Sequence, residues 1–374
     1  MEKNYPGFLA VWDILYMKIL FIFPATYNEN DFGGMHKFVS NMAKYYHEKG
    51  DEVVMVFLNK RFCYPCYGKV VEMGDGITSN VVFKVVKAIH RCYKLNKVLG
   101  SEKSDVIYNL FWLMPLLLFK YRKKTLSAFH SNPFFMAPIW QFIVKNVFTL
   151  SNKLIVPSYS IARMMTNKWG VTNVIGVNNP IDFNCSSKKL AEVVCVKEFH
   201  PYIVSVCRLM PLKNLHLLIA AYELSKMRQF ASLVIIGDGE LRDDLANYIS
   251  LKRLETKVHL LGMIDNPLPF VGQSLFFVSS SLTEACPLAI GEAQFCGVPI
   301  VSAKWFGSDE LIIDGINGLL VQYNDKRALA EGMDRMYFDI TFREKCKNGA
   351  RNSIKHLSLE KIMRQYDELF YSDV

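Results

Sequence analysis

The stretch of sequence that decides the fold runs from Ser279 to Ser302 and reads SSSLTEACPLAIGEAQFCGVPIVS. An apolar strand ends here in small polar residues, Pro287 opens a helix, and Gly297 stops that helix just before a second apolar strand begins at Pro299. A strand, a helix and a strand joined by short connections are typical of an α/β protein with a parallel sheet.

The same alternation continues along the chain in two series. The first predicts strands over residues 18–23, 52–58, 106–110, 125–130, 154–157 and 174–177, with helices over 34–49, 83–99, 115–123, 137–150 and 160–169. The second predicts strands over 202–207, 232–237, 258–261, 275–279, 299–302 and 318–321, with helices over 215–226, 240–252, 288–296, 308–314, 326–337 and 341–355. The alternation of strands and helices is weak over residues 184–197, which are predicted to be a linker.

We therefore expect an α/β fold with two facing Rossmann-like domains, over residues 17–184 and 195–355, and a helix over 356–374 that crosses back to the first domain. A cleft between the carboxyl ends of the two sheets would hold the ligand. Residues 1–16 precede the first strand, MKILFIFP, and are interpreted as an extension upstream of a native start at Met17. Mass spectrometry that finds Met1 at the amino terminus of the native protein would refute that interpretation.

The composition is that of a folded protein with two domains. The chain has 374 residues, 51% hydrophobic and 21% charged, which excludes a disordered chain. No run of eighteen apolar residues occurs, so we expect no membrane-spanning helix. The nine cysteines are scattered, and Cys63-Tyr-Pro-Cys66 has no second pair to complete a zinc site. We expect a reduced protein that is cytoplasmic, or peripheral on the cytoplasmic face of the inner membrane.

Positive charge is concentrated in the first half. Residues 1–184 hold 22 Lys and Arg against 12 Asp and Glu, whereas residues 185–374 hold 22 against 23. A basic half favours an anionic partner such as acidic lipid headgroups or a lipid diphosphate, although solubility alone would also explain it. Nucleic acid is not expected, because no nucleic-acid-binding module is recognisable. The segment FKYRKK over residues 119–124 is either a peripheral membrane-docking patch or the basic end of a buried helix.

Two carboxylates in the deciding stretch are separated by seven intervening residues. Glu284 follows the strand at the tip of the sheet, where a sugar ring would lie, and Glu292 could accept hydrogen bonds from two adjacent hydroxyls such as those of ribose. The first turn of the helix, at Pro287, Leu288 and Ala289, offers backbone N–H groups to an anion. Two glutamates on a solvated helix face would give the same pattern.

Two cations lie on the loop after an earlier strand, in VSVCRLMPLKNLHLL over residues 204–218. Arg208 and Lys213 suit a diphosphate, and fixed cations would stabilise the charge that develops on it as it leaves. The chain has no Asp-x-Asp pair, so we expect no metal and no cofactor, only a nucleotide sugar as co-substrate. Either cation taken alone could equally be a surface residue.

Glycines and one histidine complete the set of candidate residues. Gly33–Gly34 follows a strand and could let backbone N–H groups approach a phosphate or sugar closely, whereas Gly237–Gly239 follows a strand and is predicted to form a tight turn near the donor. Neither segment completes the G-x-G-x-x-G dinucleotide fingerprint. His130 ends a strand and would point into the cleft, although a lone histidine is often structural.

Together these segments resemble the retaining GT-B glycosyltransferases of family 4, the group 1 glycosyl transferases. The resemblance covers Met17 to the end of the chain and is weaker in the first half. The segments that carry it are Gly33–Gly34, His130, Asn179–Asp182, Arg208, Lys213, Gly237–Gly239, Gly262, Glu284, Glu292, Gly297–Pro299, Gly307–Glu310 and Asp314–Gly318.

The resemblance implies that the second domain binds the nucleotide sugar and that transfer retains the anomeric configuration, with the leaving phosphate helping to deprotonate the acceptor. The implied contacts are ribose with Glu292, the donor sugar with Glu284 and His130, the diphosphate with Arg208 and Lys213, and the base with backbone around Gly262 and Met263. Departures from the family pattern at Ala285–Cys286, Pro180 and Lys304–Phe306 leave the donor sugar open.

We expect a metal-independent hexosyltransferase. It would move a hexose or N-acetylhexosamine from a nucleotide sugar, with UDP favoured by family frequency, to a glycan acceptor that is lipid-linked, in bacterial O-antigen, capsule or lipopolysaccharide synthesis. The alternatives are a sugar-nucleotide epimerase or another GT-B enzyme without a lipid acceptor. A phosphorylase would need a longer chain and a pyridoxal lysine, and the failed glycine fingerprints argue against a nicotinamide-dependent oxidoreductase.

Overall fold

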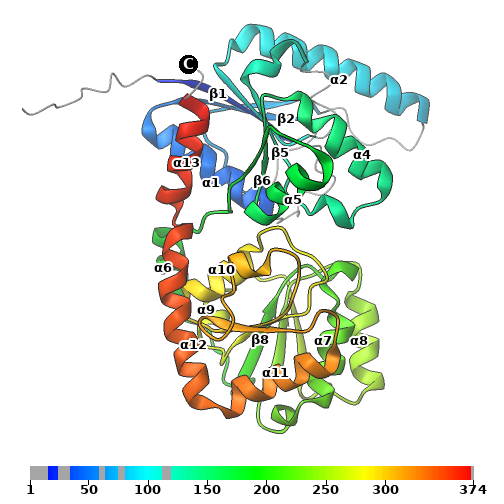
Figure 1. Cartoon of the computed structure of the whole chain (residues 1–374), viewed down its shortest axis with the longest axis vertical. Coiled ribbons are helices and arrows are strands. Elements are labelled where there is room, and N and C mark those ends of the chain that lie inside the picture. Colours follow the sequence, from blue (N-terminus) through cyan, green and yellow to red (C-terminus); the bar gives the residue numbers. More distant parts are fainter. Residues whose placement is uncertain (1–15, 24–33, 59–63, 75–80, 112–118, 372–374) are drawn as a thin grey trace, which may run out of the picture. The chain divides into compact units, whose positions relative to one another are not determined.

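The computed structural model describes residues 16–23, 34–58, 64–74, 81–111 and 119–371 (Figure 1). Contacts within the chain divide it into two compact units, Met1–Leu126 with Val374 and Ser127–Asp373. Gly33, Cys63 and the proposed extension up to residue 15 lie outside the described residues. The predicted domain boundaries stay predictions.

The first unit is built on parallel strands in the order β3-β2-β1-β4. Its elements are β1 (Lys18–Phe23), α1 (Gly34–Lys49), β2 (Glu52–Phe57), β3 (Lys69–Glu72), α2 (Val81–Glu102), β4 (Val106–Asn109) and the 3-10 helix η1 (Phe119–Lys124). The central strand β1 is an uninterrupted apolar run because both faces of a parallel sheet are covered. Strand β3 was not predicted, since it is short and most of its residues are exposed.

The second unit begins with parallel strands in the order β5-β6-β7. Its first elements are β5 (Thr125–Ala128), η2 (Pro133–Phe135), α4 (Pro138–Asn146), η3 (Phe148–Leu150), β6 (Lys153–Val156), α5 (Tyr159–Trp169), β7 (Val174–Gly176) and α6 (Phe183–Leu190). Helix α6 occupies the start of the predicted linker. It forms there because the Asp182 carboxylate accepts the Cys185 N–H at 2.9 Å, which caps its amino terminus.

A six-stranded parallel sheet follows, in the order β10-β9-β8-β11-β12-β13. Its strands are β8 (Tyr202–Val206), β9 (Ser232–Ile236), β10 (Val258–Gly262), β11 (Phe277–Ser279), β12 (Ile300–Ala303) and β13 (Gly318–Val321). The order reverses between β8 and β11. In open α/β sheets, ligands bind at such a reversal, outside the carboxyl ends of the strands.

Helices cover both faces of this sheet (Figure 1). The helical elements of this part of the chain are η4 (Pro211–Lys213), α7 (Leu215–Leu224), η5 (Lys226–Gln229), α8 (Arg242–Leu251), α9 (Leu268–Gly272), α10 (Leu288–Phe295), η6 (Ser308–Glu310), α11 (Lys326–Phe338), α12 (Ile340–Ser353), η7 (Ile354–Leu357) and α13 (Leu359–Tyr371). Helices α7, α8 and α11 pack together on one face, and α9 and α10 lie on the other. The core between the first group and the sheet includes the fully buried Ile203, Leu218 and Met333.

The end of the chain returns to residues of the first predicted domain, as expected. Ser358 forms a β-bridge with Ile181. On α13, the Oε1 of Gln365 accepts a hydrogen bond from the Tyr159 hydroxyl at 3.1 Å.

The predicted helix over residues 308–314 is wrong, because only the 3-10 helix η6 forms there. The Asn317 side chain accepts the Ile313 N–H at 2.7 Å, and Gly315 adopts a φ of 70°. These two features turn the chain toward β13 before a helix can continue.

Candidate active site

The loops that follow β8 and β11 are joined at the reversal point of the six-stranded sheet. The Leu282 N–H donates to the Leu212 carbonyl at 2.9 Å, and the Ser280 hydroxyl donates to the Lys213 carbonyl at 2.8 Å. Both loops therefore have fixed paths, and they bring Lys213 and Glu284, which are 71 residues apart in sequence, to one place.

Lys213 and Glu284 form an ion pair. The Lys213 Nζ lies 2.5 Å from the Glu284 Oε1, and the Ser281 hydroxyl donates to the same oxygen at 2.7 Å. The side chains are 18% and 14% exposed, so both stay within reach of a ligand while being largely withdrawn from water. In this environment a charge–charge contact is stronger than on an open surface.

Arg208 lies at the start of the same loop and is exposed. Its neighbour Cys207 is half-buried, and loss of hydration raises the pKa of the Cys207 thiol to about 11, with Lys213 lowering it and Glu284 raising it further. The thiol is therefore neutral at neutral pH.

The loop after β9 packs directly on the loop that carries Arg208. Gly237 has a φ of 134°, and a Cβ there would lie 1.9 Å from the Cys207 carbonyl oxygen. A Cβ on Gly239 would lie 2.4 Å from the Leu209 carbonyl oxygen. The Leu209 N–H in turn donates to the Asp238 carbonyl at 2.9 Å. These glycines are required for close packing of two backbone segments, which fits the tight turn predicted for them.

The loop after β10 joins the same edge of the sheet. The Gly237 N–H donates to the Gly262 carbonyl at 2.8 Å. Gly262 has a φ of 75°, and Met263 after it is 49% exposed. Three successive loops, after β8, β9 and β10, are thus joined by backbone hydrogen bonds at the edge where the nucleotide was expected.

Helix α10 begins immediately after Pro287, as predicted. Leu288 and Ala289 form its first turn, where backbone N–H groups lack acceptors within the helix. Glu292 lies one turn further and is only 9% exposed, so it is not on a solvated helix face. Its carboxylate also raises the pKa of Cys296, though burial is the larger cause of the shift to about 12.

The segment after β5 lies against the connection that carries Glu284. Asn132, two residues after the half-buried His130, donates through its amide to the Thr283 hydroxyl at 3.1 Å, and both side chains are buried. Sequence reasoning missed Asn132. The signal was an Asn-Pro pair after a strand, because Asn132 also caps η2 by accepting the Phe134 N–H at 3.1 Å.

A second contact to this connection comes from Asn179. Its amide donates to the Cys286 carbonyl at 2.8 Å, and its N–H donates to the Cys286 sulfur at 3.3 Å. Asn132 and Asn179, both from the first half of the sequence, therefore hold the two ends of residues 283–286. Gly34, by contrast, begins α1 in the first unit and is exposed.

Glu310 follows β12 and caps helix α5. Its carboxylate accepts the Ser158 hydroxyl at 2.8 Å, the Tyr159 N–H at 3.0 Å and the Ser160 N–H at 2.6 Å. In the sequence, Glu310 is noted only as part of the segment Gly307–Glu310, which carries the family resemblance. Its role as a cap could not be inferred, because the capped helix begins 151 residues earlier.

Two family models match the chain. The model described as "Glycosyl transferases group 1" matches residues 188–353, and the one described as "Glycosyltransferase Family 4" matches residues 32–184. Together they cover most of the two predicted domains.

Among curated relatives, the chain is similar to two enzymes of Campylobacter jejuni. It is 33% identical over 187 residues, half of each chain, to N-acetylgalactosamine-N,N'-diacetylbacillosaminyl-diphospho-undecaprenol 4-alpha-N-acetylgalactosaminyltransferase. The match therefore spans about half the length of that relative. It is 24% identical over 313 residues, 80% of this chain and 84% of the other, to GalNAc-alpha-(1->4)-GalNAc-alpha-(1->3)-diNAcBac-PP-undecaprenol alpha-1,4-N-acetyl-D-galactosaminyltransferase.

Among solved structures, Anabaena HepE in complex with UDP-glucose is similar in fold. The TM-score is 0.79 at 19% identity, over 96% of this chain and 100% of that one. The family models, the two parallel sheets and this likeness agree, and the chain belongs to the group 1 glycosyltransferases with the two-domain α/β GT-B fold.

Proposed function

We propose that the chain transfers a hexose or N-acetylhexosamine from a nucleotide sugar, with UDP favoured, to a glycan carried on a lipid diphosphate, in the synthesis of a bacterial surface polysaccharide. The observation that carries this proposal is the Lys213–Glu284 ion pair at the reversal point between β8 and β11. A cation and a carboxylate that meet there have the chemistry for a sugar diphosphate.

The ion pair also indicates how the donor would be received. The Glu284 carboxylate neutralises the Lys213 ammonium. A donor diphosphate carries more negative charge than one carboxylate and would take over the ammonium. Glu284 would then be released to accept hydrogen bonds from the donor sugar hydroxyls.

The other site residues complete this arrangement. Arg208 would bind the diphosphate from the start of the same loop, and the first turn of α10 would donate N–H groups to it. Glu292, buried one turn further, would hold the ribose. His130 would contact the donor sugar. As the nucleotide leaves, the two cations would stabilise the charge on its diphosphate without a metal, and we propose that the anomeric configuration is retained.

The relatives support the acceptor class. Both Campylobacter enzymes are named for acceptors built on diphospho-undecaprenol. A lipid diphosphate is an anion, which agrees with the basic first half of this chain. We assign the acceptor as a short glycan linked to a polyprenyl diphosphate.

A two-stage assay tests the proposal. Thermal shift with UDP- and GDP-sugars identifies the donor, and transfer to lipid-diphosphate glycans is then followed by mass spectrometry, with the new linkage assigned by NMR. An α-linked product from an α-linked donor, formed equally in EDTA, is expected. A β-linked product, or activity lost in EDTA and restored by a divalent metal, would contradict retention or metal independence.

The alternative of a sugar-nucleotide epimerase makes a different prediction. An epimerase would change the sugar or release free nucleotide in the absence of any acceptor. A transferase would form no new sugar nucleotide and would release UDP at a rate that rises with the acceptor concentration.

Membrane docking is the remaining proposal, centred on residues 119–124 of η1. Phe119 is 50% exposed, and Lys120, Arg122 and Lys123 are exposed. Lys124 differs, because it donates to the Ser104 carbonyl and burial lowers its pKa. No helix in the described part of the chain is long and apolar enough to cross a bilayer. We expect the triple change of Lys120, Arg122 and Lys123 to Gln to reduce flotation with anionic liposomes; unchanged flotation would reject the patch.

A further inference from the structure

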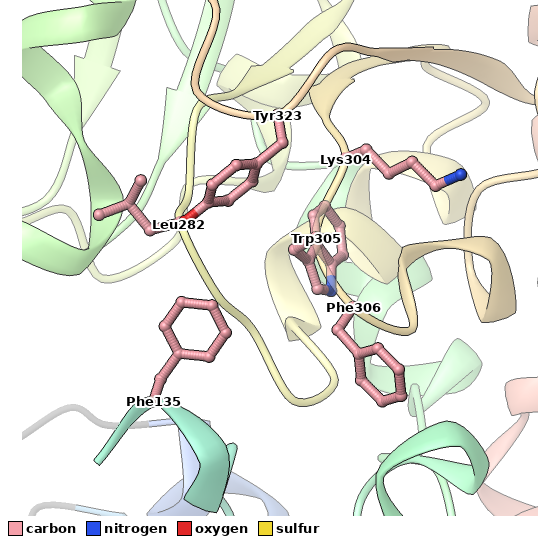
Figure 2. A pocket seen from close by; sticks show the side chains of 6 residues that line it. All are labelled: Phe135, Leu282, Lys304, Trp305, Phe306 and Tyr323. Carbon is pink, nitrogen blue, oxygen red and sulfur yellow. The ribbon is translucent and has the colours of Figure 1, made fainter. Parts of the chain in front are cut away.

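An aromatic pocket lies within the second unit, beside the connection that carries Glu284. It has a volume of about 330 Å³ and is lined by Phe135, Leu282, Lys304, Trp305, Phe306 and Tyr323 (Figure 2). Phe135 ends η2, Leu282 lies between β11 and α10, residues 304–306 follow β12, and Tyr323 follows β13.

The side chains of this pocket offer rings and little charge. Phe135, Phe306 and Tyr323 are 47%, 42% and 41% exposed, whereas Trp305 is 3% exposed and forms part of the packed structure. In Figure 2 the Lys304 amine points away from the rings. Exposed aromatic side chains gathered around one open hollow offer an apolar surface on which a ligand can stack, since water is a poor partner for them.

The ligand that fits is a pyranose. Its C–H groups form an apolar face that stacks on an aromatic ring, and its hydroxyls stay at the edge in water. Lys304 is the one cation among the six lining residues, and its amine points away from the rings, so the pocket offers no positive charge to a phosphate. The volume is at the lower end of the range of small-molecule sites, about 300–1,000 Å³, so it suits one or two sugar residues better than a long polyprenyl chain.

The position of the pocket indicates whether its sugar belongs to the donor or to the acceptor. Leu282 lies two residues before Glu284, and its backbone is fixed to the loop of Lys213. Thr283 is bound to Asn132, three residues before Phe135. The pocket is thus linked through Leu282 and Thr283 to the connection that carries Glu284. The residues assigned to the donor sugar, base and ribose do not themselves line it.

We propose that the aromatic pocket binds a sugar residue of the acceptor glycan by stacking on Phe306, Tyr323 and Phe135. This inference deepens the proposed function and rests on it. Lys304–Phe306 departs from the usual family pattern, so the pocket would give this chain an acceptor preference of its own.

The test uses Phe306→Ala and Tyr323→Ala, two exposed positions whose truncation leaves the core intact. With a water-soluble glycan acceptor that carries no polyprenyl chain, we expect the acceptor KM to rise about tenfold in each, equivalent to about 1.4 kcal/mol. The donor KM and the slow hydrolysis of the donor without acceptor should change less than twofold. Phe306→Tyr should restore the acceptor KM.

Phe338→Ala is the matched control. Phe338 is 50% exposed and lies at the end of α11, in edge-to-face contact with Phe230 and Tyr337 rather than in the pocket. Phe338→Ala should leave the acceptor KM, the donor KM and the rate of donor hydrolysis unchanged.

Three results would overturn the inference: a raised donor KM with the acceptor KM unchanged, no change in either, or an effect seen only with polyprenyl-linked acceptors. If the wild-type chain transfers no sugar at all, the proposed function fails instead. The pocket is then judged by direct titration of the same glycan, where binding lost in Phe306→Ala supports it and absence of binding rejects it.

Discussion

The connections that follow β11 and β12 each carry a glutamate, and the two carboxylates have different kinds of partners. Glu284 is held by side chains, the Lys213 ammonium and the Ser281 hydroxyl. Glu310 is held mainly by backbone, the N–H groups of Tyr159 and Ser160 at the start of α5, with the Ser158 hydroxyl added.

This difference is the one expected between a carboxylate that a ligand could recruit, as proposed for Glu284, and a structural one. Side-chain partners can rotate toward a ligand at small cost. Backbone N–H groups at a helix terminus cannot, and they need an acceptor whether or not a ligand is present. Glu284 could therefore serve the proposed donor site, whereas Glu310 holds the start of α5.

The largest expected effect is that of Lys213→Ala. Removing the cation that would stabilise the departing diphosphate should lower kcat by about a thousandfold, in line with the loss of one strong electrostatic contact in an active site. The melting temperature should hardly change, because the surrounding loops are fixed by backbone hydrogen bonds. Initial rates with saturating donor measure the first effect, and calorimetry measures the second.

Lys326→Ala, at the exposed start of α11, is the control for loss of a positive charge. Near-wild-type turnover in Lys213→Ala would show that the Lys213–Glu284 pair does not act on the donor. Glu284 could then no longer be distinguished from Glu310 as a ligand-binding carboxylate. Glu292→Ala should behave like Lys213→Ala in activity, because the buried carboxylate is assigned to the ribose.

Glu310→Ala should show the reverse pattern. It leaves two backbone N–H groups and one hydroxyl at the start of α5 without their carboxylate acceptor, so we expect a loss of about 2 kcal/mol in the free energy of unfolding. Urea denaturation measures the loss, with Glu331→Ala on the exposed face of α11 as control. Stability equal to that of the wild type would show that Glu310 is not a structural residue.

The smallest effect concerns the thiol in the connection after β11. Burial raises the pKa of Cys286 to about 12, so at pH 7.5 even less of this thiol is in the reactive thiolate form than in an ordinary cysteine. Peptide mapping after iodoacetamide treatment should find the exposed Cys185 and Cys195 alkylated well before Cys286. Equal alkylation rates of the three cysteines would mean that the hydrogen bonds from Asn179 do not keep Cys286 buried.

The sequence predicted helices and strands well where neighbouring residues determine their ends. Pro287 and Gly297 marked both ends of α10, and the two cations were correctly assigned to a loop after a strand. The linker was read from composition, yet Asp182 caps a helix there. Strand β3 was missed because its four residues show no alternation of buried and exposed positions.

The contacts of the candidate site were less predictable, because they join residues far apart in the chain. Nothing near Asn132 in sequence reveals Thr283, and nothing near Glu310 reveals α5. The aromatic pocket likewise gathers six residues from four separate segments of the chain. The sequence could predict which residue types lie at the edge of the sheet, but the pairings depend on tertiary packing.

The most direct test of the exchange of Lys213 between Glu284 and the donor is calorimetric titration with UDP of the wild type, Lys213→Ala and Glu284→Gln. If the diphosphate takes the ammonium from the carboxylate, Lys213→Ala should weaken UDP binding by about 10- to 100-fold, equivalent to about 1.4–2.8 kcal/mol. Glu284→Gln should bind UDP as tightly as the wild type or more tightly, yet transfer no sugar. Unchanged UDP affinity in Lys213→Ala, or weaker affinity in Glu284→Gln, would contradict the account.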